Sequence, residues 1–209
     1  MSADLPAQLL RRQDESADED FYLEPRLVAH IDDAAIEALG QFFREHIPDG
    51  AAVLDLMSAY LSHLPADVRQ RCRSVVGLGM NAEEMAANAQ LSKYVVHNLN
   101  REPTLPFEDA SFDAAVCTVS VQYLLHGTGV FGEVGRVLRP GAPFMVSFSN
   151  RCFSTKAVAA GLYANDQQHA ALVGLYFERS GCWQDISVAD ISPNPGVTDP
   201  MYVVWARRA

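Results

Sequence analysis

Asp55 is the residue whose place in the sequence most suggests ligand chemistry. It belongs to the apolar run Val53–Leu56, which has the composition of a buried strand, and a turn follows that run. A nucleotide-binding fold normally places glycines in this turn, because glycine takes positive φ at little cost and lets the backbone approach a ligand. Here Met57, Ala59 and Leu61 stand at those positions. Asp55 either contacts a ligand, directly or through water, or only caps the turn.

The loop after Asp55 is expected to differ from a glycine-rich turn. An ordinary residue in the left-handed conformation costs about 1–2 kcal/mol. We therefore predict another backbone path, in which the small residues Ser58 and Ala59 allow a ligand to come close.

Three histidines could act as proton acceptors near neutral pH. His63 follows this loop, His126 lies beside Tyr123 after a later apolar run, and His30 precedes the first long helix. Each of them could equally be structural or exposed. His63 is favoured because it is next to the predicted pocket.

Two arginines and a tyrosine complete the candidates. Tyr22 and Arg26 lie in an ordered N-terminal segment that could close over the site, and Arg151 follows the fifth predicted strand. Paired arginines suit an anionic ligand such as a carboxylate or phosphate. The alternative is that Arg26 pairs with the acidic N-terminus and Arg151 with a surface carboxylate.

Composition limits the function classes. The chain has 209 residues, 49% of them hydrophobic, and a formal net charge of −10, with no basic stripe, which disfavours nucleic acid. No apolar run approaches the length of a membrane helix, and the N-terminus lacks a signal core, so we expect a cytoplasmic protein. The four cysteines are far apart, without metal-ligand spacing, so no metal is expected. Oligomeric state stays open.

The elements alternate in a regular way. Residues 1–20 are acidic and predicted to be a mobile tail, and residues 21–209 a single domain. Helices are predicted from Asp32 or Asp33 to about Ile47, from Asn81 with Glu84 completing a capping box, over 130–138, and from Asn165 or Asp166 to about Arg179. Strands are predicted over 53–56, 74–78, 94–96, 112–119, 144–148, 186–191 and 201–206. This alternation predicts a parallel sheet covered on both faces, with an antiparallel pair at one edge.

Four segments in this order resemble the class I S-adenosylmethionine-dependent methyltransferase superfamily, of the methyltransferase type 11 kind, in an uncharacterised subgroup with a degenerate glycine motif. They are Val53-Leu54-Asp55-Leu56, Val75-Val76-Gly77-Leu78-Gly79-Met80-Asn81, Leu105-Pro106-Phe107-Glu108-Asp109-Ala110-Ser111-Phe112-Asp113 and Glu133-Val134-Gly135-Arg136-Val137-Leu138-Arg139-Pro140-Gly141. The resemblance implies a Rossmann-like three-layer α/β sandwich. Its seven-stranded, mostly parallel sheet has the order 3-2-1-4-5-7-6, with strand 7 antiparallel.

The resemblance also implies S-adenosylmethionine as the cofactor and places its binding residues after successive strands, where ligands of such sheets sit. These residues are Asp55, Met57, Ser58, Ala59, Gly79, Met80, Asn81, Asn98, Leu99 and Ser120. Gly79 stands where the superfamily usually has an acid that holds the ribose hydroxyls. Asn81 is then either a ribose ligand or a helix cap, and Asn98 replaces an aspartate that often binds the adenine amino group.

The expected function is methylation of a small-molecule acceptor, which two nearby arginines would suit if the acceptor is anionic. Methyl transfer needs positioning and partial desolvation more than a fixed set of catalytic groups, so His63, Tyr22, Tyr123, Arg26 and Arg151 stay candidates without assigned roles. The alternative is a non-catalytic member of the fold that serves as a partner subunit or binds another ligand. In that case the side chain of Met57 or Tyr60 would fill the adenosyl site.

Overall fold

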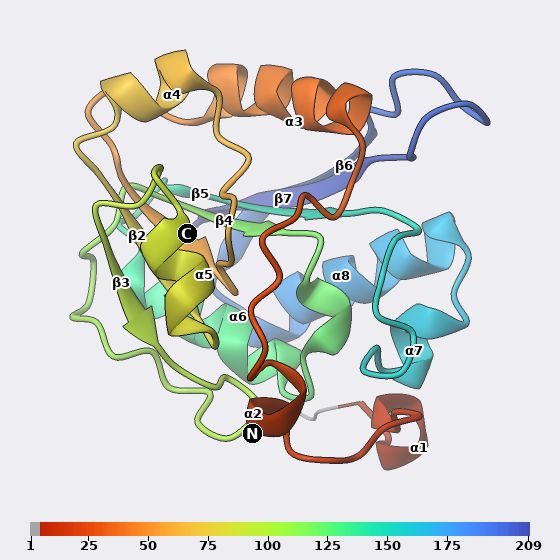
Figure 1. Cartoon of the computed structure of the whole chain (residues 1–209). Coiled ribbons are helices and arrows are strands. Elements are labelled where there is room, and N and C mark those ends of the chain that lie inside the picture. The colour runs from red at the N-terminus through yellow and green to blue at the C-terminus, as the bar shows by residue number, and fades with distance from the viewer. Residues whose placement is uncertain (1–4) are drawn as a thin grey trace.

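A seven-stranded sheet forms the centre of the protein (Figure 1), whose computed structural model describes residues 5–209. The strands are β1 (Ala52–Leu56), β2 (Ser74–Gly79), β3 (Lys93–Val96), β4 (Ala114–Thr118), β5 (Pro143–Phe148), β6 (Trp183–Asp190) and β7 (Tyr202–Arg208). They lie in the order β3-β2-β1-β4-β5-β7-β6, and β7 runs antiparallel to both of its neighbours. The sheet order and the antiparallel edge pair predicted from the sequence are confirmed.

Helices cover both faces of this sheet. They are α1 (Ala7–Leu10), α2 (Asp18–Phe21), α3 (Asp33–His46), α4 (Ala66–Arg71), α5 (Ala82–Ala87), α6 (Gly127–Val137), α7 (Ala159–Leu162) and α8 (Asp166–Ser180), with a 3₁₀ turn, η1, at Val121–Tyr123. In Figure 1, α3 and α4 lie on one side of the sheet, and α6 and α8 on the other. The molecule therefore has the three layers of an α/β sandwich.

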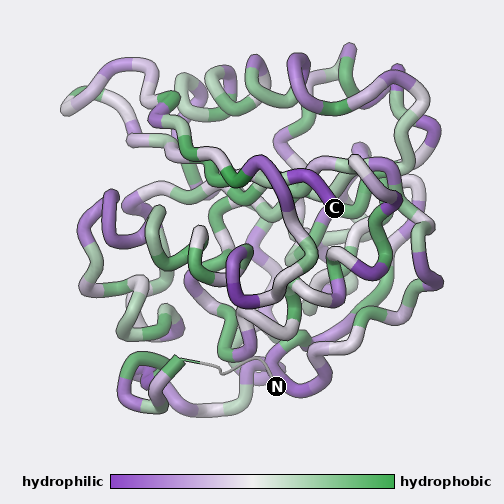
Figure 2. The backbone as a smooth tube through the Cα atoms, turned by 180° about the vertical axis from the view of Figure 1, so that it is seen from behind, coloured by the Kyte–Doolittle hydropathy of each residue, from purple (hydrophilic) through white to green (hydrophobic). Residues whose placement is uncertain are grey.

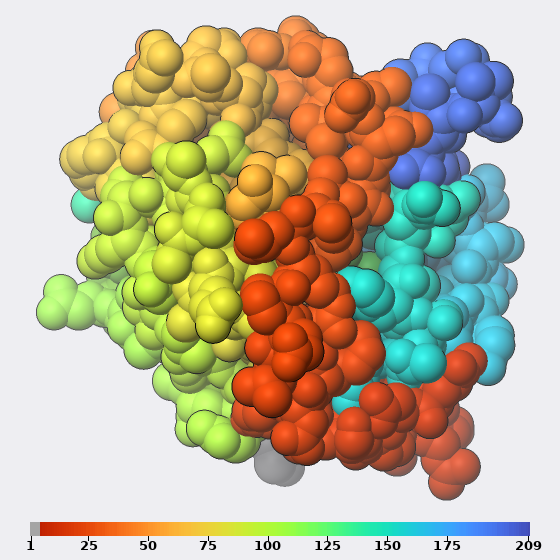
Figure 3. Space-filling model, in the orientation of Figure 1, coloured from red at the N-terminus to blue at the C-terminus, as the bar shows by residue number. Residues whose placement is uncertain are grey.

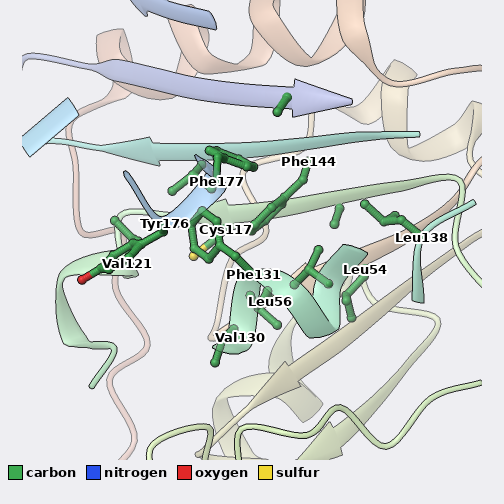
Figure 4. Close-up of a cluster of buried hydrophobic side chains, with 14 of the residues drawn as sticks. Leu54, Leu56, Cys117, Val121, Val130, Phe131, Leu138, Phe144, Tyr176 and Phe177 are labelled. Carbon is green, nitrogen blue, oxygen red and sulfur yellow. The ribbon is translucent and has the colours of Figure 1, made fainter. Parts of the chain in front are cut away.

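Alternate residues of each central strand point to the two faces, so that every strand contributes to two cores. Leu54 and Leu56 of β1 pack toward α6 and α8, where Phe131, Phe144 and Phe177 meet edge to face (Figure 4). Val53 of β1 points the other way and joins Leu39 and Phe43 of α3. Figure 2 shows the apolar residues concentrated in the central strands and on the inner sides of the helices.

The local signals for the long helices act as predicted. The Asp32 side chain accepts a hydrogen bond from the Ala35 N–H at 2.8 Å and caps α3. Asn165 and Gln168 form a capping box at the start of α8, and Gly181 ends that helix with φ of 71°. The predicted capping box of α5 is wrong in one part, because the Glu84 side chain accepts from the Arg26 N–H at 2.7 Å instead of from Asn81.

The N-terminal segment lies against the domain. Of the predicted mobile tail, residues 5–20 are described, whereas residues 1–4 lie outside the described residues. Asp18 is only 5% exposed and its carboxylate receives a hydrogen bond from Arg12. In Figure 3 this segment crosses the front surface between the region of residues 60–100 and that of residues 150–165. We call residues 12–30 the strap. The mobility expected of residues 1–20 stays a prediction.

No helix within residues 5–209 combines the length and the apolar character needed to cross a lipid bilayer.

Candidate functional site

A cavity of about 370 Å³ lies at the carboxyl ends of β1, β2 and β4, with the strap forming one wall. It brings together every residue predicted for the cofactor site: Asp55, Met57, Ser58, Ala59, Gly79, Met80, Asn81, Asn98, Leu99 and Ser120. The candidates Tyr22, Arg26, His30, His63, Tyr123 and Arg151 line the same cavity. His126 is not among the lining residues. What these residues bind stays a prediction, but their convergence supports a single site.

Asp55 is held by the loop that follows it. Its Oδ2 accepts hydrogen bonds from Ser58 Oγ at 2.6 Å and from Ser62 Oγ at 2.7 Å, and the residue is 2% exposed. Burial raises the pKa of Asp55 to about 6, and the two hydroxyl hydrogen bonds oppose this rise. Asp55 therefore caps the loop, while its Oδ1 accepts no hydrogen bond from residues 5–209 and can meet a ligand.

The expected path of this loop is wrong at its first residue. Met57 takes φ of +58°, the left-handed conformation that the glycine-rich turn would use, although it carries a side chain. His63 and Val119, which also line the cavity, have φ of +56° and +45°. Such values are rare for residues other than glycine, and for a β-branched residue they mark strain. Three strained residues in one cavity wall indicate that the surrounding contacts determine its shape.

The loop runs unusually close to β2. The Ser58 N–H donates to the Leu78 carbonyl at 2.8 Å, which continues the ladder beyond the end of β1. As a result the Ser58 carbonyl oxygen would lie 2.0 Å from a Cβ at position 79, a distance that no side chain tolerates. Gly79 is therefore required by packing. A carboxylate cannot stand at that position to hold a ribose.

Asn81 is the cap of α5 rather than a free ribose ligand. Its Oδ1 accepts from the N–H groups of Glu83 and Glu84, both at 2.9 Å, and its Nδ2 donates to the carbonyls of Tyr22 and Leu23. All hydrogen-bonding capacity of the amide is thus engaged with the helix and the strap.

Asn98 is also engaged by the strap. Its Nδ2 donates to Glu19 Oε1 at 2.9 Å, and its Oδ1 accepts from the Asn100 N–H at 2.9 Å. The side-chain oxygen retains a second lone pair, and Asn98 lines the cavity, so that it can still accept a bond from an amino group.

A buried ionic cluster, missed by the sequence analysis, fastens the strap. Lys156 is fully buried, and its Nζ donates to the carbonyl and the hydroxyl of Ser16 and lies 3.3 Å from Asp14 Oδ2 and 3.6 Å from Asp18 Oδ1. Asn100 donates to the other oxygen of Asp18 at 2.9 Å. The acidic composition of residues 14–20 is the one sequence signal for this cluster, because buried acids need positive partners.

Arg26 sits in an aromatic environment. Its guanidinium lies 4.6 Å from the Phe21 ring centre and 5.1 Å from that of Phe153, and its Nη2 donates to the Phe21 carbonyl at 3.0 Å. No carboxylate within residues 5–209 pairs with it. The predicted pairing of Arg26 with the acidic N-terminus is therefore wrong. Arg151, in contrast, lies 3.5 Å from Asp199 and is 62% exposed, as its alternative interpretation predicted.

His63 has no hydrogen-bond partner within the described chain. The residue is 8% exposed, and its Nδ1 is buried without a partner. Burial lowers the pKa of His63 to about 4, and the nearby His30 contributes to that lowering. The imidazole is therefore neutral at physiological pH.

The two tyrosines keep their protons. Burial raises the pKa of Tyr22 well above its ordinary value and raises that of Tyr123 to about 12. The Tyr123 hydroxyl accepts from the Phe153 N–H at 2.8 Å, which makes it a positioning group for the segment after β5.

Among residues 5–209 there is no cluster of histidine, cysteine and acidic side chains that could hold a metal ion.

Comparison with known proteins agrees with this geometry. A protein-family model described as a methyltransferase domain matches residues 56–146. That stretch runs from the end of β1 to β5 and contains the segments after β1, β2, β3 and β4 that line the cavity. No curated protein matches the chain by sequence.

Solved structures share the fold at low sequence identity. An S-adenosylmethionine-dependent methyltransferase from Aquifex aeolicus matches with 14% identity and a TM-score of 0.61, over 92% of this chain and 97% of that one. One from Mesorhizobium loti matches with 18% identity and a TM-score of 0.58, over 82% and 98%. The [4+2]-cyclase SpnF matches with 15% identity and a TM-score of 0.59, over 81% of this chain and 80% of that one.

Proposed function

We propose that this protein, which has the fold of class I S-adenosylmethionine-dependent methyltransferases, binds S-adenosylmethionine in the cavity at the ends of β1, β2 and β4 and methylates a small-molecule acceptor. The supporting observation is that this cavity is open. Tyr60 does not line it, and Met57 lines it without filling it. The non-catalytic alternative required one of these side chains to occupy the adenosyl site.

The residues present fit the donor at three points. Asp55 offers a carboxylate oxygen that has no other partner within residues 5–209, at the strand end where a ligand of this fold is expected. Met80 and Leu99 are apolar residues of the lining at the ends of β2 and β3 and would contact the adenine faces. Asn98 would accept a hydrogen bond from the adenine amino group.

The ribose is the part of the donor to which this cavity offers the weakest hydrogen bonds. Position 79 has no room for an acidic side chain, and Asn81 caps α5. Within residues 5–209, no charged group therefore stands at the usual ribose position. A hydrogen bond to a charged partner contributes about 1.5–3 kcal/mol, against about 1 kcal/mol for a neutral one. The corresponding loss of affinity is about three- to thirtyfold, at about 1.4 kcal/mol per decade.

In the proposed reaction, the residues of this chain position the donor and limit the access of water. S-adenosylmethionine supplies a methyl group already activated on a sulfonium. Asp55 and the strained loop hold the donor, while the strap limits the access of water to the cavity and contributes Tyr22 and Arg26 to its lining.

Titration calorimetry with S-adenosylmethionine and S-adenosylhomocysteine tests this function. Binding of both is expected, and Asp55→Ala should weaken it at least tenfold. Glu45→Ala, on the exposed face of α3, removes one carboxylate away from the cavity and should leave the affinity unchanged. Absence of heat and of a thermal shift with either nucleotide at millimolar concentration would overturn the proposal.

A second candidate is a protein of this fold that binds a different ligand and transfers no methyl group. The Ser58–Gly79 approach and the Asn98–Glu19 hydrogen bond favour it, because both occupy positions where a nucleoside would be held. The fold also occurs in the [4+2]-cyclase SpnF, so that fold alone does not decide the reaction. The same calorimetry separates the two candidates.

A further inference from the structure

We infer that the methyl acceptor is a carboxylate, bound by Arg26 and His63 in the half of the cavity next to the strap and converted to a methyl ester. The inference rests on the proposed function and specifies its acceptor. It starts from two polar side chains that line the cavity. Arg26 is half-buried and its guanidinium has no carboxylate partner within residues 5–209, and the buried Nδ1 of His63 has no hydrogen-bond partner there.

Arg26 is the first of these. Its guanidinium contacts the rings of Phe21 and Phe153 and has no carboxylate partner within residues 5–209. Two of its N–H groups reach the carbonyls of Phe21 and Glu24, the latter at 3.5 Å, so that others of its five donors are free. A guanidinium enclosed by aromatic rings gains most from a planar anion that takes two parallel hydrogen bonds, and a carboxylate has that geometry.

His63 is the second. Nδ1 is buried and has no partner in the described chain, and a buried N–H without an acceptor is the least tolerated of unsatisfied groups. We therefore assign the ring proton to Nε2, the nitrogen left to face the cavity that His63 lines. The neutral ring then offers a hydrogen-bond donor, which an anion accepts, and adds no second positive charge beside a sulfonium.

His30 connects the two groups. Its ring lies 5.4 Å from the Phe153 ring, in an edge-on arrangement. Its pKa is lowered first by burial and also by Arg26, while Glu84 opposes this lowering. The charge of His30 in turn lowers the pKa of His63, and all three side chains line the same cavity, so that they belong to one neighbourhood.

The groups around Arg26 and His63 are poorly suited to act as a base toward an acceptor. The pKa of His63 falls to about 4, that of His30 is lowered, and the Tyr22 and Tyr123 hydroxyls keep their protons. Three carboxylates also line the cavity, and each is engaged. Asp55 accepts two hydroxyl hydrogen bonds, Glu84 accepts from the Arg26 N–H, and Asp18 pairs with Arg12 and Lys156. An alcohol acceptor would have to lose a proton during methyl transfer, whereas a carboxylate has none to lose.

The step balances without a base. One oxygen of the carboxylate forms a bond to the methyl carbon while the bond between that carbon and sulfur breaks, and its electron pair stays on sulfur. The products are a methyl ester and a neutral thioether, and no proton is released. The negative charge of the acceptor and the positive charge of the donor cancel in the transition state, which a desolvated cavity favours.

Binding of matched probes tests the inference independently of turnover. The full chain, saturated with S-adenosylhomocysteine, is titrated with benzoate and benzamide and with hexanoate and hexanamide. At least one acid should bind ten times more tightly than its amide, since a charged hydrogen bond contributes about 1.5–3 kcal/mol. Arg26→Gln should remove this preference, and His63→Asn, which tolerates positive φ, should reduce it. Arg44→Gln, an equal loss of charge on the surface of α3, should retain it.

Turnover supplies the second readout. With tritiated methyl donor, the label in the product should be released as volatile methanol by mild alkali, which cleaves methyl esters but not methyl ethers or methylamines. If S-adenosylhomocysteine binds but neither acid binds better than its amide, or if inorganic phosphate binds and both acids do not, the carboxylate assignment is overturned and the proposed function stands. If S-adenosylhomocysteine does not bind, the proposed function fails and this inference with it.

Discussion

The carbonyl oxygen of Ser58 lies so close to Gly79 that a Cβ on residue 79 would be 2.0 Å away from it. The contact joins the loop after β1 to the last residue of β2, at the centre of the carboxyl edge of the sheet. It explains why position 79 carries glycine and not the acidic residue that the resemblance to S-adenosylmethionine-dependent methyltransferases leads one to expect there. The loop and an acidic side chain cannot share this space.

Gly79→Ala should therefore destabilise the protein, by about 1–3 kcal/mol or more, because the clash is with backbone that cannot rotate away. Gly79→Asp should be at least as harmful and should not tighten nucleotide binding. Denaturant unfolding measures both. Gly129→Ala in α6 is the matched control, since nothing lies within 4 Å of its Cβ position, and it should stabilise by about 0.5–1 kcal/mol. A Gly79→Asp variant that bound S-adenosylhomocysteine more tightly would contradict the Ser58 contact.

The strain at Met57 can be isolated by comparing two small substitutions. Met57→Gly and Met57→Ala remove the same packing, but only glycine relaxes at φ of +58°. The glycine variant should be more stable than the alanine variant by about 1 kcal/mol, measured by chemical denaturation. At position 59, where φ is not positive, the parent protein with alanine should be more stable than the Ala59→Gly variant. Equal stabilities at position 57 would show that the loop relaxes.

Asp55→Asn should change the pH dependence of stability in a defined direction. The pKa of Asp55 is about 6 in the folded protein against 3.8 for an unperturbed side chain. Between these values the folded state binds more protons than the unfolded state, so that the Asp55 contribution falls as the pH rises. Asparagine is neutral throughout. The variant should match the parent near pH 4 and exceed its stability by about 3 kcal/mol above pH 6.

Urea unfolding of both proteins at several pH values measures this difference. Histidines such as His63 and His169, whose pKa values are lowered to about 4, stabilise the protein increasingly as the pH rises toward 6.5. They act equally in both proteins and cancel in the difference. A difference that did not vary with pH would show that Asp55 is not desolvated.

Lys156→Met should release the strap while leaving the sheet intact. Methionine fills much of the lysine volume but donates no hydrogen bond to Ser16 and leaves Asp14 and Asp18 without this cation. Hydrogen exchange of residues 12–22 should accelerate about tenfold or more, since each bond to a charged group contributes about 1.5–3 kcal/mol. Lys93→Met, at an exposed position of β3, should not affect exchange in the strap. Unchanged exchange in the Lys156 variant would show that other contacts hold the strap.

Much of the fold could be predicted from short-range patterns. The apolar runs that became β1, β2, β4 and β5 are buried strands because their residues suit both cores of a covered sheet. The caps at Asp32 and Asn165 depend on neighbours three residues away. The edge pair β6–β7 followed from the absence of a helix between two apolar runs. The short helix α4 was not predicted, because its six residues bury only Val68.

The sequence by itself determined the layered fold, the edge of the sheet where the site lies and the residue types that reach it, because these depend on periodicity and on side chains close together in the chain. Only the tertiary structure decided what those residues can do. It left no room for an acidic side chain at position 79 and made Asn81 the cap of α5. It also left Arg26 without a carboxylate partner and His63 without a hydrogen-bond partner in the described chain, and it placed the acidic residues 14–18 against Lys156 beside the cavity. Each of these depends on contacts between segments far apart in the sequence, such as Lys156 with residues 14–18, and the energy of such contacts is invisible to a local pattern.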